Sequence, residues 1–178
     1  MSWTAPATVT AGQLMTAAFW NTHVRDNLLE TAAAAATTAG GIFVATGANA
    51  IAERIIGSDT DYNARTTAST SFVALTGAPA VTVTTDTQAL AHWRGKMNNN
   101  TNNAQAILGV AVSGATTVAA DDDIALQQQS SPADNQIWIG TSHLFTGLNG
   151  GSNVFTLNAR CNAGTASYDR MELVVIPL

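Results

Sequence analysis

The chain has 178 residues, of which 46% are hydrophobic and only 11% are charged, and its formal net charge is −5. This length suffices for one domain with a core, or for a small domain with an extension. Its 7 basic residues are too few for a phosphate-binding surface, so we expect no nucleic-acid partner. No apolar run approaches the ~20 residues that span a bilayer, and no signal segment is recognisable, so we expect no membrane insertion. The single cysteine excludes an intrachain disulfide.

Residues 1–40 are predicted to form an extended attachment arm followed by an α-helix. Thr10 and Gln13 have the spacing of a capping box, in which each side chain bonds to the backbone of the other residue. This spacing predicts a helix from Ala11 to about Ala36. Pro6 favours an extended arm before it.

Within this helix, apolar and small residues recur at alternating spacings of four and three residues. Such a heptad seam with one polar Asn is typical of helices that associate between subunits. A single amphipathic helix packed on its own domain would give a similar pattern, so both interpretations stay open. The seam residues that we predict at a subunit interface are Leu14, Asn21, Val24 and Leu28.

The rest of the chain reads as β structure. Residues 42–46 and 51–56 are predicted to pair as a hairpin across a turn at 47–49; together with a linker at 57–61 they make up a segment spanning residues 41–62. Residues 63–178 then alternate with period two between turn signals, which predicts a mainly β domain, a jelly-roll-like β-sandwich. The predicted strands of this domain are 68–75, 80–85, 88–97, 105–112, 115–119, 124–128, 136–146, 153–161 and 170–177.

The predicted last strand is apolar on both faces. Leu173 shares one face with Met171 and Val175, while Val174 and Ile176 lie on the other. A strand that is apolar on both faces is expected to be covered on both. We predict that Val174 and Ile176 contact another subunit, although the N-terminal helix is an alternative cover.

Few residues point to chemistry. The three histidines, His23, His92 and His143, lack metal-ligand spacing, and Cys161 lies on an apolar face, where it is expected to be a buried small hydrophobe. The run at residues 121–123 is predicted to be an exposed acidic turn, with a calcium site as the lesser alternative. Because no nucleophile or phosphate-binding motif occurs, we expect no enzyme activity, no cofactor and no metal.

Two tryptophans, Trp93 and Trp138, lie in predicted strands. Aromatic side chains on the surface of a β-sandwich can bind sugar rings, whereas aromatic side chains inside it fill the core. We interpret both as core residues and keep the sugar-binding alternative open.

Several segments resemble a group of small virion proteins of tailed bacteriophages. These segments are the opening SWTAP, TAAFWNTHVRDNLLE, GGIFVATGANAIAERIIGSD, and in the C-terminal half GVAVSGATT and LFTGLNGGSNVFTLNARC. The resemblance covers most of the chain. It implies a virion structural protein, a short surface fibre or a capsid decoration, and it supplies no catalytic residues.

The resemblance also implies partners and a location. Such β-domains are commonly trimers, made in the host cytoplasm and carried on the virion surface, where they bind other virion proteins of the capsid or tail. In this chain we expect Trp3, Phe19 and Trp20 to dock onto such a protein. The alternatives are a tail-associated receptor-binding protein that recognises a host-surface glycan, and a carbohydrate-binding module.

Overall fold

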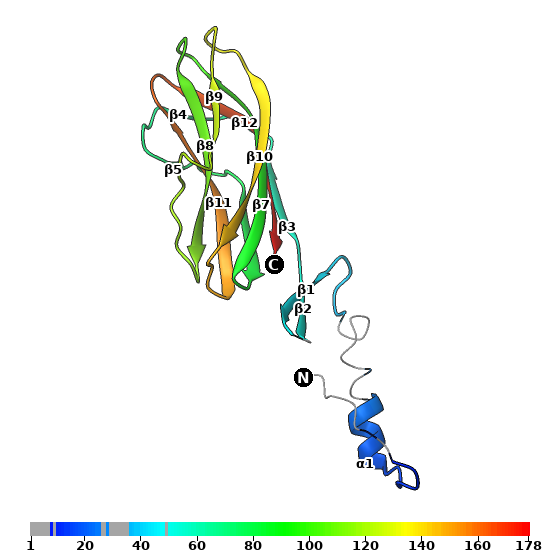
Figure 1. Cartoon of the computed structure of the whole chain (residues 1–178). Helices are drawn as coiled ribbons and strands as arrows, with labels where there is room; N and C mark the ends of the chain where they lie inside the picture. Colours follow the sequence, from blue (N-terminus) through cyan, green and yellow to red (C-terminus); the bar gives the residue numbers. More distant parts are fainter. Residues whose placement is uncertain (1–7, 9, 26–27, 29–35, 49) are drawn as a thin grey trace. The chain divides into compact units, whose positions relative to one another are not determined.

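The computed structural model describes residues 8, 10–25, 28, 36–48 and 50–178, and the chain divides into two compact units (Figure 1). The N-terminal unit is Met1–Ile55 and the C-terminal unit is Ile56–Leu178. Trp3 and Pro6 lie outside the described residues. No helix within the described part of the chain is long and apolar enough to cross a membrane.

The helix of the N-terminal unit begins later than predicted. The α-helix α1 spans Ala17–Trp20 and continues into a π-helical turn, η1, at Asn21–Arg25. Its N-cap is Thr16, whose hydroxyl oxygen accepts a hydrogen bond from the backbone N–H of Phe19 at 3.2 Å. Thr16 therefore takes the capping role that we had expected of Thr10.

The predicted capping box forms a turn instead of a helix start. The N–H of Thr10 does donate to the side-chain oxygen of Gln13 at 3.2 Å. Between them, however, Gly12 has a φ of +84°, and a helix does not run through this left-handed conformation. The prediction of a helix from Ala11 is therefore wrong at its start, and its stretches at 26–27 and 29–35 lie outside the described residues.

The predicted hairpin is confirmed. Strands β1 (Ile42–Gly47) and β2 (Ala50–Arg54) pair antiparallel. The carboxylate of Glu53 accepts hydrogen bonds from the backbone N–H groups of Thr37 and Thr38, both at 2.9 Å. The Thr37 hydroxyl also donates to this carboxylate. The bond from the hydroxyl is the main reason why the pKa of Glu53 lies below its usual range, and the two backbone bonds lower the pKa further.

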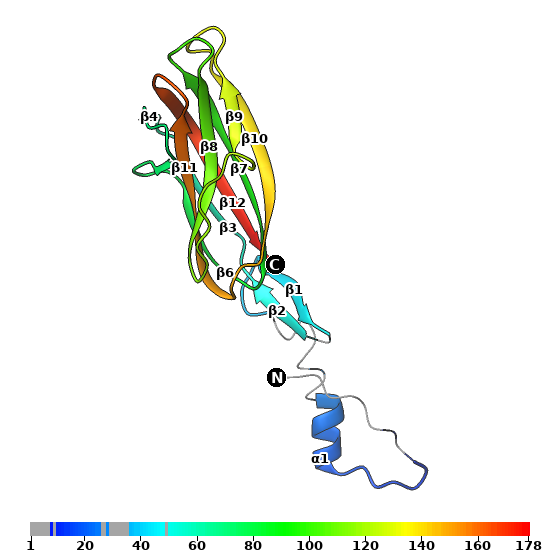
Figure 2. The same cartoon turned by 60° about the vertical axis from the view of Figure 1, so that its left-hand side comes forward.

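The C-terminal unit is a sandwich of two antiparallel sheets, seen from two sides in Figures 1 and 2. One sheet has the order β10-β7-β12-β3, with β4 also paired to β12, and the other has the order β5-β11-β8-β9, with β6 also paired to β11. The chain crosses from one sheet to the other between β6 and β7, between β7 and β8, and at each step from β9 to β12, while β8 and β9 are neighbours in one sheet. This repeated crossing is the course of a jelly roll. The predicted fold class is therefore confirmed. The strands are β3 (Gly57–Asp61), β4 (Arg65–Thr67), β5 (Val73–Ala74), β6 (Ala80–Thr85), β7 (Gln88–Asn99), β8 (Gln105–Gly114), β9 (Leu126–Gln129), β10 (Ile137–Thr146), β11 (Gly151–Cys161) and β12 (Ala166–Pro177).

The core lies between the sheets and contains the predicted inward faces. Phe155 and Leu157 of β11 are fully buried, as are Leu173 of β12 and Trp93 of β7. The indole N–H of Trp93 donates to the carbonyl of Leu108 at 3.1 Å, so this polar group is satisfied inside the core. The interpretation of Trp93 as a core residue is confirmed.

Three local predictions are wrong. Residues 57–61, predicted as a linker, form β3, which pairs with β12. The predicted strand at 68–75 is reduced to β5, at Val73–Ala74. Before it, the Ser69 hydroxyl donates to the carbonyl of Ser71 at 2.6 Å, a bond within the same loop. Such local bonds compete with a β ladder. Residues 115–119 form no strand, and Val118 makes only an isolated bridge to Val112.

Candidate functional site

The outer face of the sheet β10-β7-β12-β3 carries a mixed set of apolar, aromatic and charged side chains. Neighbouring strands are in register, so outward-facing residues form rows across the sheet. Along β10 the row positions are Trp138, Gly140, Ser142 and Leu144, which face Lys96, Arg94, His92 and Leu90 of β7 in that order. All four β7 residues also face β12, where Asp169, Glu172, Val174 and Ile176 stand opposite Lys96, Arg94, His92 and Leu90.

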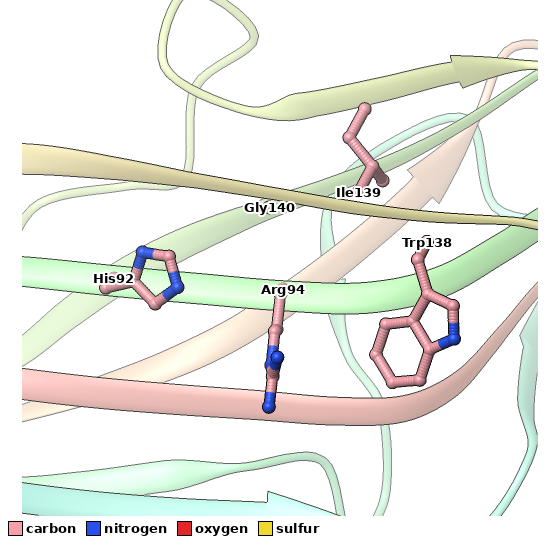
Figure 3. Close-up of a pocket in the computed structure, with 5 residues that line it drawn as sticks. All are labelled: His92, Arg94, Trp138, Ile139 and Gly140. Carbon is pink, nitrogen blue, oxygen red and sulfur yellow. The ribbon is translucent and has the colours of Figure 1, made fainter.

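One end of this face is built around Trp138, which is 50% exposed. The Arg94 guanidinium carbon lies 5.7 Å from the centroid of the Trp138 ring, within the range of a cation–π contact. Arg94 is in turn held by Glu172, whose Oε2 accepts from Nε at 2.8 Å and also pairs with Nη2. Figure 3 shows the indole with its broad side to the viewer and Arg94 next to it.

A hollow of about 350 Å³ opens beside this pair and is lined by His92, Arg94, Trp138, Ile139 and Gly140 (Figure 3). Gly140 stands opposite Arg94 in the register. A Cβ atom at this position would approach the Arg94 Cβ to 3.0 Å, so a larger residue here would crowd Arg94.

The other end of the same face is apolar. Leu144 is 43% exposed, and Leu90, Val174 and Ile176 are half-buried. The predicted division of the last strand is confirmed, since Leu173 points into the core and Val174 and Ile176 lie on the outer face. Their contact with another subunit stays a prediction.

Of the predicted docking and seam residues that the structure describes in the N-terminal unit, three are exposed and three are half-buried. Leu14 is 82% exposed and precedes α1, so it does not start a helical seam; Trp20 is 56% exposed and Leu28 is 61% exposed. Phe19 is half-buried, with its ring centroid 4.6 Å from that of His23. Asn21 and Val24 are half-buried within η1.

Two further residues singled out in the sequence, Cys161 and Asp122, make contacts that stabilise the fold. Cys161 is buried, which confirms its interpretation as a small hydrophobe. Asp122 of the acidic turn accepts a hydrogen bond from the Arg160 Nε at 2.9 Å. Among the described residues, no group of three or more His, Cys, Asp or Glu is placed to hold a metal ion.

Sequence reasoning did not find the cluster around Trp138, and the interpretation of Trp138 as a core residue is wrong. Arg94 and Glu172 are 78 positions apart in the chain, and only the register of β12 against β7 brings them together. Side chains alternate between the two faces of a strand, so a buried Trp93 does place its neighbours His92 and Arg94 on the outer face of the sheet. The position of Trp138 against them depends on how β10 pairs, which no local pattern gives.

No family model matches this chain, and no curated protein matches its sequence. Among solved structures, the chain is similar to Eiger TNF from S. frugiperda, with 12% identity, coverage of 70% of this chain and 93% of that one, and a TM-score of 0.47. It is also similar to VP2 of infectious bursal disease virus in a subviral particle, with 9% identity, coverage of 74% and 36%, and a TM-score of 0.48. A third similar structure is the CBM22-1 xylan-binding domain from Paenibacillus barcinonensis Xyn10C, with 14% identity, coverage of 68% and 97%, and a TM-score of 0.32. These values describe a likeness in the course of the chain and carry no information on function.

Proposed function

We propose that this chain is a non-enzymatic virion structural protein of a tailed bacteriophage, a short surface fibre or capsid decoration. Its N-terminal unit docks onto another virion protein and its β-sandwich projects outward. One observation carries the proposal: none of the described residues of the N-terminal unit is buried, whereas the sandwich has a closed core.

A segment whose described residues are all at least partly exposed gains burial from elsewhere. An isolated two-stranded hairpin is only marginally stable in water, and the unit leaves several large apolar side chains exposed. Contiguous exposed apolar surface is typical of interaction sites. The sequence resemblance to phage virion proteins, which includes this segment, suggests a virion protein as the partner. The exposed apolar side chains of the unit include Leu14, Met15, Trp20, Phe43, Ile51 and Ile55.

The proposal includes a homotrimer. Its support is the resemblance together with the apolar end of the outer sheet face, where Leu90, Leu144, Val174 and Ile176 lie in adjacent rows. A stable interface typically removes ~1,600 Å² of surface from water. These four side chains would form the apolar centre of such an interface, and polar residues would surround them.

Light scattering on the full chain and on residues 56–178 tests the assembly. The shorter chain must begin at Ile56, because a start at residue 63 would remove β3 from the sheet. A trimer of both chains indicates that the sandwich makes the subunit contacts. A trimer of the full chain alone indicates that the N-terminal unit makes them. A monomer in both contradicts the proposed trimer.

A second candidate is a tail-associated receptor-binding protein, which the hollow beside Trp138 favours. The two candidates differ in the effect of added protein on infection. Purified receptor-binding protein would bind the host cells and compete with the phage, whereas a decoration would be present in many copies per particle and would not compete.

A further inference from the structure

The outer sheet face carries an aromatic platform next to a charged donor and acceptor. We infer that the hollow lined by Trp138, Arg94 and Gly140 is a binding site for a neutral pyranose sugar of a glycan, with Glu172 as a fourth contact. This inference goes beyond the proposed virion role and does not depend on it.

The platform is Trp138. A single exposed aromatic is common on protein surfaces, but this one has a special setting. Its ring is half exposed, it shows its broad side in Figure 3, and it lines the hollow together with Gly140, the next outward-facing position on β10. The electron-rich face of an indole attracts the weakly positive C–H groups of a neighbouring ring, and one face of a pyranose consists of such groups.

The polar partners are Arg94 and Glu172. Both contacts between them use Oε2 of Glu172, one to Nε and one to Nη2. Within the described part of the chain, neither Oε1 of Glu172 nor Nη1 of Arg94 has a hydrogen-bond partner. The ion pair therefore places one charged acceptor and one charged donor side by side, with the Glu172 side chain 28% exposed and the Arg94 side chain 52% exposed. Two neighbouring hydroxyl groups of a sugar, one donating and one accepting, match this arrangement.

The charges favour a neutral ligand. The positive charge of Arg94 is matched by Glu172 in the same row, and Lys96 stands opposite Asp169 in the next. These four residues thus carry two positive and two negative charges. The whole chain is acidic, with a net charge of −5. An anionic sugar would gain little from such a surface.

The site leaves room for the proposed trimer. Trp138 and Leu144 are both outward-facing on β10, and a strand rises ~3.4 Å per residue, so they are ~20 Å apart along the sheet. The apolar end can therefore be covered by another copy while the platform stays open.

The site is shallow, so a single sugar is expected to bind weakly, with a Kd of about 1 mM. Saturation-transfer difference NMR detects binding in this range. The probes are the methyl glycosides of glucose, galactose, mannose and N-acetylglucosamine, each added to the full-length protein. At least one of them is expected to give a signal concentrated on the protons of one ring face.

Matched variants locate the binding. Trp138→Ala is expected to weaken binding about tenfold or more, Trp138→Phe to keep part of it, and Glu172→Gln to reduce it. Trp20→Ala removes an equally exposed tryptophan from the other unit and is expected to bind like the wild type. The midpoint of urea unfolding reports whether each variant is folded.

Three results would overturn the inference: no signal from any of the four glycosides, an undiminished signal in folded Trp138→Ala, or an equal loss in Trp20→Ala. These results would remove the support for the receptor-binding candidate but do not bear on the proposed decoration, which light scattering and particle incorporation test separately.

Discussion

The hydroxyl of Tyr168 binds both backbone polar groups of Ile107, lying 3.1 Å from its nitrogen and 3.0 Å from its carbonyl oxygen. Tyr168 belongs to β12 and Ile107 to β8, so the contact joins the two sheets across the core. The hydroxyl also lies against the carbonyl of Arg160. Burial raises the pKa of Tyr168 far above its usual range, which keeps the group a neutral donor.

Tyr168→Phe is therefore expected to destabilise the sandwich. It removes the acceptor of a buried N–H and the donor to buried carbonyls, which costs about 1–3 kcal/mol in the free energy of unfolding. Urea denaturation measures this difference. The matched control is Tyr62→Phe, at the only other tyrosine, which is 75% exposed and should leave the midpoint unchanged. Equal stability of the two variants would contradict the cross-sheet role.

Asp61→Asn is expected to loosen the junction between β3 and β4. The Asp61 carboxylate is almost fully buried and accepts from the Arg65 side chain at 2.6 Å and from the Asn63 N–H at 3.0 Å. The variant leaves the charge of Arg65 without its partner, and at neutral pH we expect a loss of about 1–3 kcal/mol. Thermal or urea unfolding measures it, with the exposed Asp123→Asn as the control.

The same carboxylate gives a pH dependence with a defined sign. The Arg65 side-chain bond is the main reason why the pKa of Asp61 is lower in the folded protein than its usual value. A depressed pKa contributes stability that is fully present above the unfolded-state pKa and is lost as the pH falls through the folded-state pKa. The difference between the wild type and Asp61→Asn should therefore shrink in acid. A difference that grows below the usual aspartate range would show that this linkage is wrong.

Glu53 gives a local pH signal in the N-terminal unit. Its carboxylate accepts from the Thr37 hydroxyl, which is the main reason why its pKa is lowered, and from the N–H groups of Thr37 and Thr38, which lower the pKa further. The amide proton shifts of both threonines are expected to titrate together, with a midpoint below the usual glutamate range. Two-dimensional NMR follows this change, and Glu53→Gln should abolish the titration. Independent midpoints for the two amides would contradict a shared carboxylate.

Trp20→Ala is expected to weaken incorporation of the chain into phage particles while the sandwich stays folded. The reason is that Trp20 is a large aromatic side chain, 56% exposed, in a unit where none of the described residues is buried, and such residues often dominate an interface. Immunoblots of purified particles, normalised to a capsid protein, measure incorporation. Trp138→Ala serves as the control with an exposed tryptophan in the other unit. Normal incorporation of Trp20→Ala would refute its docking role.

The sequence predicts the sandwich well where alternation is strong. The strand predicted at 80–85 matches β6, and the inward faces around Phe155 and Leu173 are as expected. The sequence does not predict β3, because its residues, GSDTD, are polar and turn-forming. They form a strand because the edge of β12 is free to pair with them. The site around Trp138 depends on pairings between distant strands. A single sequence specifies the faces of such strands, but not which neighbour each will have.

The position of β12 also has a consequence for synthesis. This strand lies between β7 and β3 and is the last of the sandwich to be made. Until it leaves the ribosome, β7 has an open edge and β3 has no sheet to join, and open edges invite pairing with other chains. Folding of the nascent chain should therefore be delayed until residue 177 has emerged. Ribosome-bound chains that stop short of β12 would then be cut readily by protease, whereas chains that expose all of β12 would resist it.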